Sequence, residues 1–214
     1  MSPAARRRVR ALPLLLLVLG LTLWTLGQGG AVMRADLGSK RARNQVAEWA
    51  AAGTGWSAEE WLAARAAMQT ALQVTPDDPF LHDLLAHLHV TQGLLAWDDP
   101  AQREASFSQA LGHHGASLRL RPGDGPTWSQ LTVTLYALGR PPAEIQQAWQ
   151  QARRFAPREA PTQLALADLA FATWDTATPD MREWVLQAYA QALPGTQAAM
   201  REDAKRRGRA DLLP

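Results

Sequence analysis

The chain contains no cysteine, and only four phenylalanines and two tyrosines occur among its 214 residues. The missing cysteine excludes a disulfide scaffold, thiolate zinc sites, a lipid-modified cysteine anchor and a cysteine nucleophile. Because valine and isoleucine are also few, the composition argues against an all-β sandwich or barrel. The chain is 47% hydrophobic, with nine tryptophans, which favours a mostly helical protein with enough apolar residues for a packed core.

Motifs for catalysis and cofactor binding are missing as well. The sequence has no G-x-S-x-G, no H-E-x-x-H, no P-loop and no Rossmann glycine pattern. His82, His87 and His89 lie close together, but at 100° per residue one helix face cannot present all three to a metal. The acid pairs at 59–60, 77–78 and 98–99 stand at expected helix starts, where negative charge complements the helix dipole. We therefore expect a protein that is not an enzyme and binds no metal and no cofactor.

The charges are distributed unevenly. The net charge of +2 (22 basic minus 20 acidic residues) hides basic ends, because four arginines lie in the first ten residues and 201–209 is also basic. Between Asn44 and Thr196 there are 9 basic and 16 acidic residues, and 9 − 16 gives −7. An acidic body between basic ends does not fit a nucleic-acid-binding core, so no nucleic-acid partner is expected.

The N-terminus combines an arginine cluster with a long uncharged segment. Arg6, Arg7, Arg8 and Arg10 precede 23 residues without charge, 11–33, with Trp24 near the far end. Since a bilayer core needs about 20 helical residues, this segment can span it once and leave the arginines in the cytoplasm. We expect a single-pass inner-membrane protein with its body in the periplasm. The alternative is a cleaved signal peptide and a soluble periplasmic body, because small residues at 29 and 31 suit a cleavage site.

Three similar segments follow in the body. The segments 71–76, 117–122 and 152–157 each end in proline, with a small residue five positions before it, an acid two after it and a leucine nine after it. The prolines are 46 and 35 residues apart, a spacing typical of helical repeats. The expected structural positions of the repeat are Pro76, Leu85, Gly93, Pro122, Trp128, Leu131, Gly139, Trp149, Ala152, Pro157 and Leu166.

Apolar periodicity and capping signals place the helices. We expect them at 40–53, 57–75, 79–93, 100–121, 125–139, 142–156, 160–174 and 179–193, with a short capping helix near 196–208. A capping box at Ser57–Glu60 and prolines at 100, 142 and 179 support these starts. The stretch 100–121 is overlong for a repeat helix, so we expect Gly112-His113-His114-Gly115 to break it. The domains are then 1–33 (basic leader and membrane helix), 34–195 (helical repeats) and 196–214 (basic capping helix and tail).

This pattern resembles the tetratricopeptide repeat from about Lys40 to Leu193. Trp128, Leu131 and Gly139 match the first helix of that repeat, and Trp149 and Ala152 match the second helix. The resemblance implies an all-α fold, with a helical-repeat domain after the membrane helix, that binds partners on an extended surface.

A narrower resemblance is to the VpsP-type polysaccharide-biosynthesis proteins. It rests on the segments 117–122 and 152–159, on Trp128 and Leu131, and on Trp174 and 189–193. It implies a non-catalytic accessory protein of exopolysaccharide synthesis or export, whose partners are envelope proteins and the membrane, with the polysaccharide itself as a further candidate. The alternatives are a general periplasmic adaptor in secretion, pilus or cytochrome assembly, and a glycan-binding module that uses exposed tryptophan. Trp56 and Trp97 are the candidate surface contacts, because they fall in expected turns.

Overall fold

A computed structural model describes residues 3–52, 57–96 and 98–214. Every regular element in these ranges is helical, so the expected all-α fold is confirmed. The elements are α1 (Pro3–Ala52), α2 (Ala58–Val74), α3 (Pro79–Leu95), α4 (Pro100–Leu120), α5 (Gly125–Ala137), α6 (Pro142–Phe155), α7 (Ala160–Ala172), α8 (Pro179–Gln191), α9 (Pro194–Arg206) and the 3₁₀ turn η1 (Ala210–Leu212). The chain divides into two compact units, residues 1–77 and 78–214.

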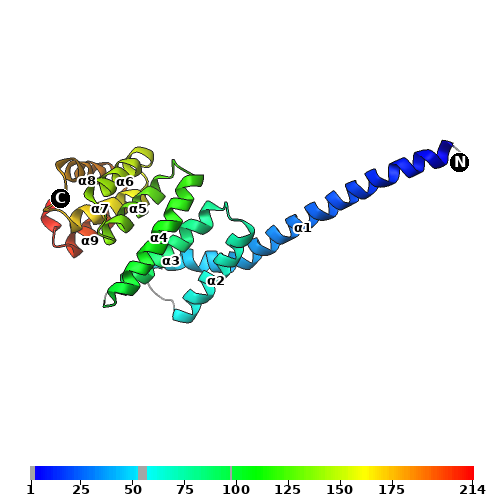
Figure 1. Cartoon of the computed structure of the whole chain (residues 1–214). Helices are drawn as coiled ribbons and strands as arrows, with labels where there is room; N and C mark the ends of the chain where they lie inside the picture. Colours follow the sequence, from blue (N-terminus) through cyan, green and yellow to red (C-terminus); the bar gives the residue numbers. More distant parts are fainter. Residues whose placement is uncertain (1–2, 53–56, 97) are drawn as a thin grey trace. The chain divides into compact units, whose positions relative to one another are not determined.

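The first unit consists of α1 and α2, which contact one another (Figure 1). The helix expected at 40–53 is the last part of α1, which runs without interruption from Pro3, so residues 33 and 34 both lie within one helix. Val46 on α1 is fully buried, as is Met68 on α2. The expected capping box begins α2: Ser57 Oγ accepts a hydrogen bond from the Glu60 amide, and the Glu60 carboxylate accepts one from the Ser57 amide.

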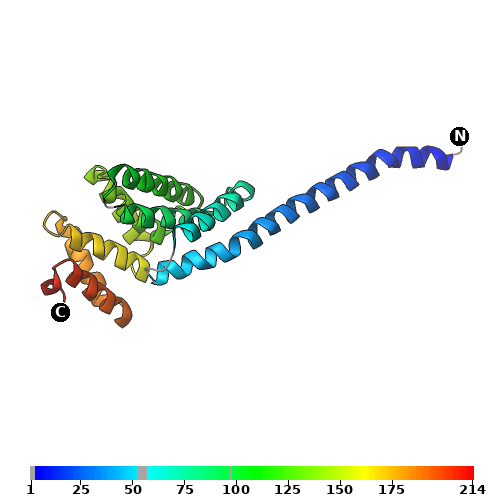
Figure 2. The same cartoon turned by 90° about the horizontal axis from the view of Figure 1, so that it is seen from below.

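The second unit is built from helix pairs. The short connection at 96–99 makes α3 and α4 an antiparallel pair, and α5 pairs with α6 (Figures 1 and 2). Further along, α5 contacts α7 and α7 contacts α9, which is the neighbour pattern of stacked helix hairpins. Trp128 and Ile145 pack against two adjoining apolar clusters, one over α4–α6 and one over α6–α9, and so make the core continuous.

Each of the three proline segments ends a helix in the same way. The residues Thr75, Arg121 and Ala156 cap α2, α4 and α6 with nearly equal dihedral angles (φ/ψ of −125°/69°, −133°/73° and −139°/55°). The amide of each donates a hydrogen bond to the carbonyl four residues earlier, at 2.8–3.0 Å. The residue before a proline is kept out of the α-helical region, which explains why these helices stop there. Tetratricopeptide geometry itself stays a prediction.

The expected break at Gly112-His113-His114-Gly115 is wrong, because α4 continues through all four residues to Leu120. A glycine inside a helix costs about 1 kcal/mol relative to alanine. On α4 this cost is outweighed by burial of Phe107, His114 and Leu118 on the face packed within the unit. Tertiary packing therefore overrides the local preference of the two glycines.

The basic C-terminal segment is paired within its own unit. Arg207 makes two hydrogen bonds to the Asp168 carboxylate, at 2.9 and 2.8 Å, and Arg209 pairs with Asp175. Leu213 joins the core, and the Tyr189 hydroxyl donates a hydrogen bond to the Pro214 carbonyl at 2.8 Å. These arginines therefore neutralise acids of the unit rather than forming a free basic surface.

Candidate functional site

The second unit contains a pocket of about 270 Å³ where α3, the end of α4 and the start of α5 meet. It is formed by side chains that converge from all three helices and from the turn between α4 and α5. The lining residues are Phe80, Asp83 and His87 from α3, His114 and Arg121 from α4 and its cap, and Asp124, Pro126, Thr127 and Gln130 from the start of α5.

One wall of the pocket is a closed charge network. The Asp83 carboxylate accepts hydrogen bonds from the Arg121 guanidinium and from Thr127 Oγ1, the latter at 3.0 Å. Arg121 also pairs with Asp124, with 3.0 Å between Nη1 and Oδ2. Asp124 in turn caps α5 by accepting the Thr127 amide at 3.0 Å. The two acids and one arginine thus hold one another, and the turn, in place.

Burial raises the pKa of the Asp83 carboxyl above its ordinary value, while hydrogen bonds from Ser117 and Thr127 and the charge of Arg121 lower it. Burial has the largest effect on this pKa. It raises the pKa because the charged carboxylate loses water when it is packed into the wall of the pocket. The hydrogen bonds and the arginine supply a polar environment in place of that water. Asp83 is therefore a structural acid whose acceptor capacity is largely used within the protein.

The other wall carries two imidazoles. His114 is only 3% exposed, and neither of its ring nitrogens has a hydrogen-bond partner among the described residues. Burial lowers the pKa of His114 to about 4, with further lowering from the charges of His113 and His87. Burial also lowers the pKa of His87. The His114 ring is therefore neutral at pH 7, with one N–H donor and one nitrogen acceptor left unpaired beside the pocket.

The pocket borders a larger histidine cluster on the facing sides of α3 and α4. His82 Nδ1 and His113 Nδ1 are 3.0 Å apart, and the rings of His89 and His113 stack with centroids separated by 5.8 Å. Burial lowers the pKa of His113 to about 4, aided by the charges of His82 and His89. Among the described residues, no group of three or more metal-ligating side chains is arranged to hold an ion.

Sequence reasoning treated the histidines of each segment separately and missed this convergence. A usable signal was present, since residues equally far from the centre of a short connection face one another in an antiparallel helix pair. The connection lies at 96–99, and His82 and His113 are equally distant from its centre. With α4 taken as one unbroken helix, the sequence therefore predicts that His82 and His113 face one another.

The residues expected at structural positions of the repeat are not among the described residues that line this pocket. Leu85, Trp149, Ala152 and Leu166 are fully buried, and Leu131 is nearly so. Trp149 meets Trp184 edge to face, with ring centroids 5.6 Å apart. These side chains contribute to the apolar interior of the second unit rather than to the site.

Trp128 and the prolines lie nearer the surface. Trp128 is half-buried and donates its indole N–H to the Pro122 carbonyl at 2.8 Å. Pro76, Pro122 and Pro157 are exposed and directly follow the helix caps. They therefore mark where the helices end rather than where a ligand binds.

The two glycines of the repeat pattern differ in role. Gly139 follows α5 with a φ of +62°, a left-handed conformation suited to a helix end. Gly93 instead lies inside α3, where an added Cβ would come within 2.9 Å of the Phe107 ring on α4. Trp56 and Trp97, the candidate surface contacts, lie outside the described residues.

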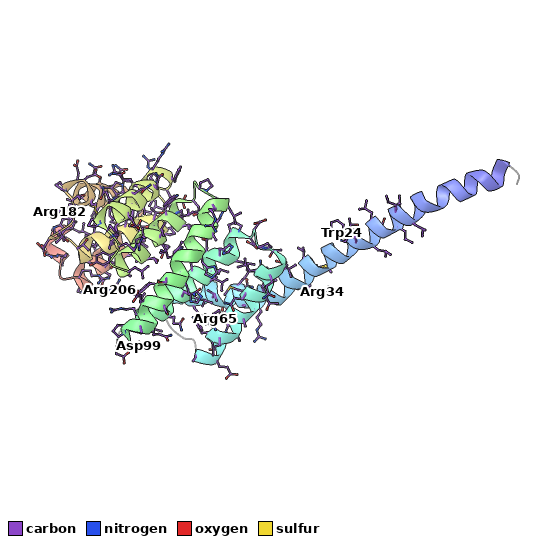
Figure 3. The ribbon with its side chains drawn as sticks, in the orientation of Figure 1. Trp24, Arg34, Arg65, Asp99, Arg182 and Arg206 are labelled. Atoms are coloured by element: carbon purple, nitrogen blue, oxygen red, sulfur yellow. The ribbon has the colours of Figure 1, made fainter. Side chains whose placement is uncertain are left out.

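The first unit supplies the other functional feature, an exposed apolar helix. The segment of α1 that begins at Leu16 is long and apolar enough to cross a membrane, and the described part of that segment is not buried. Its leucines from Leu16 to Leu26 are 55–67% exposed, and Trp24 and Arg34 project from this helix into open space (Figure 3). By length and composition, α1 is thus suited to be a single-pass anchor or a signal sequence.

No family model matches the chain, and no curated protein matches it at a significant level. The resemblance to VpsP-type proteins therefore stays a prediction from the sequence.

Proposed function

We propose that the chain is a non-catalytic adaptor held at the outer face of the inner membrane, where its helical body binds envelope proteins of exopolysaccharide synthesis or export. The observation that carries the proposal is the exposed apolar part of α1 in one helix with residues that pack against α2. Exposed leucines in such a continuous stretch are stable when lipid or another apolar partner covers them.

The charge pattern supports the orientation. The arginines at positions 6, 7, 8 and 10 precede the apolar segment, and basic residues beside a membrane helix are retained in the cytoplasm. The first charged residue after the segment is Arg34. With this orientation, α2 and the second unit lie on the periplasmic side.

The helical architecture supports an adaptor role. Stacked helix hairpins expose a long surface relative to their core and are used widely for binding other proteins. The polysaccharide system is the finer part of the proposal, and its support is the resemblance of 117–122 and 152–159 to VpsP-type proteins. Fold alone does not identify the partners.

Gene deletion with three complementing versions tests the proposal. The versions are the full chain, a chain whose residues 1–33 are replaced by an unrelated single-pass membrane helix of the same orientation, and one in which they are replaced by a cleaved signal peptide. We expect deletion to abolish surface polysaccharide, the first two versions to restore it, and the soluble version to restore it poorly.

Protein secretion, pilus assembly and cytochrome content serve as parallel readouts in the same strains. Polysaccharide that persists in the deletion strain contradicts the polysaccharide assignment. Loss of one of the other systems instead points to a general envelope adaptor. Full rescue by the soluble version contradicts the requirement for an anchor.

A further inference from the structure

We propose that the pocket between α3, α4 and α5 binds a small neutral polyhydroxylated molecule, of the size of one sugar ring. The proposal goes beyond the adaptor function and does not depend on it, since it rests on the side chains that line this pocket. It also differs from the tryptophan-based glycan contacts considered from the sequence, because the pocket lining within the described residues contains no tryptophan.

The size of the pocket limits the ligand. Its volume of about 270 Å³ lies just below the range of about 300–1,000 Å³ that is typical of pockets for drug-sized molecules. A single ring with its substituents is therefore the appropriate scale.

His114 is the observation that indicates a ligand. Buried polar groups in proteins are nearly always hydrogen-bonded, because an unpaired group loses its water without compensation. The His114 ring lines the pocket, is 3% exposed and has no hydrogen-bond partner at either nitrogen within the part of the chain that the structure describes. A second unpaired donor, Nε of Arg121, belongs to another residue of the same lining. These atoms have almost no surface accessible to solvent, so a small movement of the lining side chains is needed before a molecule that both donates and accepts can satisfy them.

The network of Asp83, Arg121 and Asp124 disfavours a charged ligand in the pocket. Arg121 already binds both Asp83 and Asp124, so an anion would face two carboxylates and a cation would find them occupied. Burying an unpaired charge is also far more costly than burying a hydroxyl. A neutral imidazole matches a hydroxyl group well, because each can donate one hydrogen bond and accept another.

The remaining lining residues complement the other features of a sugar. Phe80, at the start of α3, and Pro126, at the start of α5, both contribute apolar surface to the pocket. Gln130 adds an amide that donates and accepts. A sugar ring has C–H faces and a rim of hydroxyls, so it can use both kinds of surface at once.

Titration of the histidine-labelled, full-length protein tests the proposal. The protein is solubilised in a zwitterionic detergent, because detergents with sugar headgroups would compete. The neutral probes are the methyl glycosides of glucose, galactose and mannose, N-acetylglucosamine and myo-inositol, and the charged probes are glucuronic acid, glucosamine and inorganic phosphate. The five histidines give few ring signals, which are followed by NMR at pH 7.5.

We expect at least one neutral probe to produce saturable shifts of the His87 and His114 ring signals, with a Kd in the millimolar range. Gln130→Ala should weaken that binding about fivefold, the effect of one net hydrogen bond, and Phe80→Ala should weaken it as well. Both positions are partly exposed, so these variants should fold. Gln150→Ala, an exposed glutamine on α6 outside the pocket, is the matched control and should bind like the wild type.

Three results would overturn the proposal. The first is the absence of saturable shifts with every neutral probe up to about 50 mM, a concentration that detects millimolar binding. The second is tighter binding of a charged probe than of any neutral one. The third is an affinity that is unchanged in both Gln130→Ala and Phe80→Ala.

Discussion

Acidification should destabilise the second unit through His114, and the size of the effect follows from its burial. In the folded chain the pKa of His114 is about 4, against an ordinary value of 6.5. The unfolded chain therefore binds this proton more tightly, so that unfolding takes up protons once the pH falls below about 6.5. The stability associated with the neutral ring is complete above that pH and is lost as the pH falls toward 4.

The magnitude can be worked from the two pKa values. Between pH 7.5 and pH 5.0, the difference in proton binding lowers the free energy of unfolding by about 2 kcal/mol for His114 alone. His113 and His87, whose pKa values burial also lowers, act in the same direction but are more exposed to solvent. Asp83 acts in the opposite direction, because its raised pKa means that protonation favours the folded state at still lower pH.

The assay is urea unfolding of the detergent-solubilised full chain at both pH values, with hydrogen exchange of peptides from α3 and α4 to localise the change. The comparison variant is His114→Leu, which keeps an apolar side chain at the buried position and removes the titrating ring. We expect its loss of stability between pH 7.5 and 5.0 to be about 2 kcal/mol smaller than that of the wild type.

Comparing the two pH-dependent losses cancels any constant effect of the substitution on folding. Gln109→Leu, at an exposed position on α4, should retain the full wild-type loss and serves as the control. If His114→Leu loses as much stability on acidification as the wild type does, the reasoning from burial of this ring is refuted.

Four further variants test the packing of the second unit and the exposed apolar part of α1. Gly112→Ala should raise the free energy of unfolding by about 0.5–1 kcal/mol, because an added Cβ meets nothing within 4 Å in the middle of a helix. Gly125→Ala should lower it by well over 1 kcal/mol or prevent folding, since its Cβ would lie 2.7 Å from a backbone nitrogen; equal effects in thermal unfolding would contradict this contrast. Trp149→Ala should cost roughly 3–5 kcal/mol by emptying a fully buried site, and a denaturation midpoint close to that of the wild type would exclude it from the core. Arginine at both Leu19 and Leu23, exposed on the apolar part of α1, should release the chain from alkali-washed membranes; continued retention would argue against α1 as an anchor.

Most helix boundaries could be predicted from the sequence because they depend on local chemistry. Asp78, Asp99 and Thr178 cap their helices with side-chain hydrogen bonds, and a proline follows each of them at the first helical position. Such signals act within a few residues and need no knowledge of the rest of the fold. The apolar segment of α1 is likewise a property of consecutive residues.

The candidate site could not be predicted in this way, because it depends on which helix faces meet. Nothing near Gly112 or Gly115 indicates an unbroken helix, and the decision came from the packing of α4. That packing brings His114 beside His87 and sets both next to Asp83. Asp83 and His87 are neighbours on α3, but His114 lies on α4, far from both in the sequence, and no local pattern indicates that they converge.

The sequence by itself determined the all-α class, most of the helix ends and an N-terminal segment apolar enough to span a membrane, since each follows from the preferences of neighbouring residues. Only the tertiary structure decided that α4 is continuous, that Arg207 and Arg209 are paired with acids and that the buried, neutral imidazole of His114 lines a pocket. The physical reason is that burial and charge pairing are energies between residues brought together by folding, and they can outweigh any local preference.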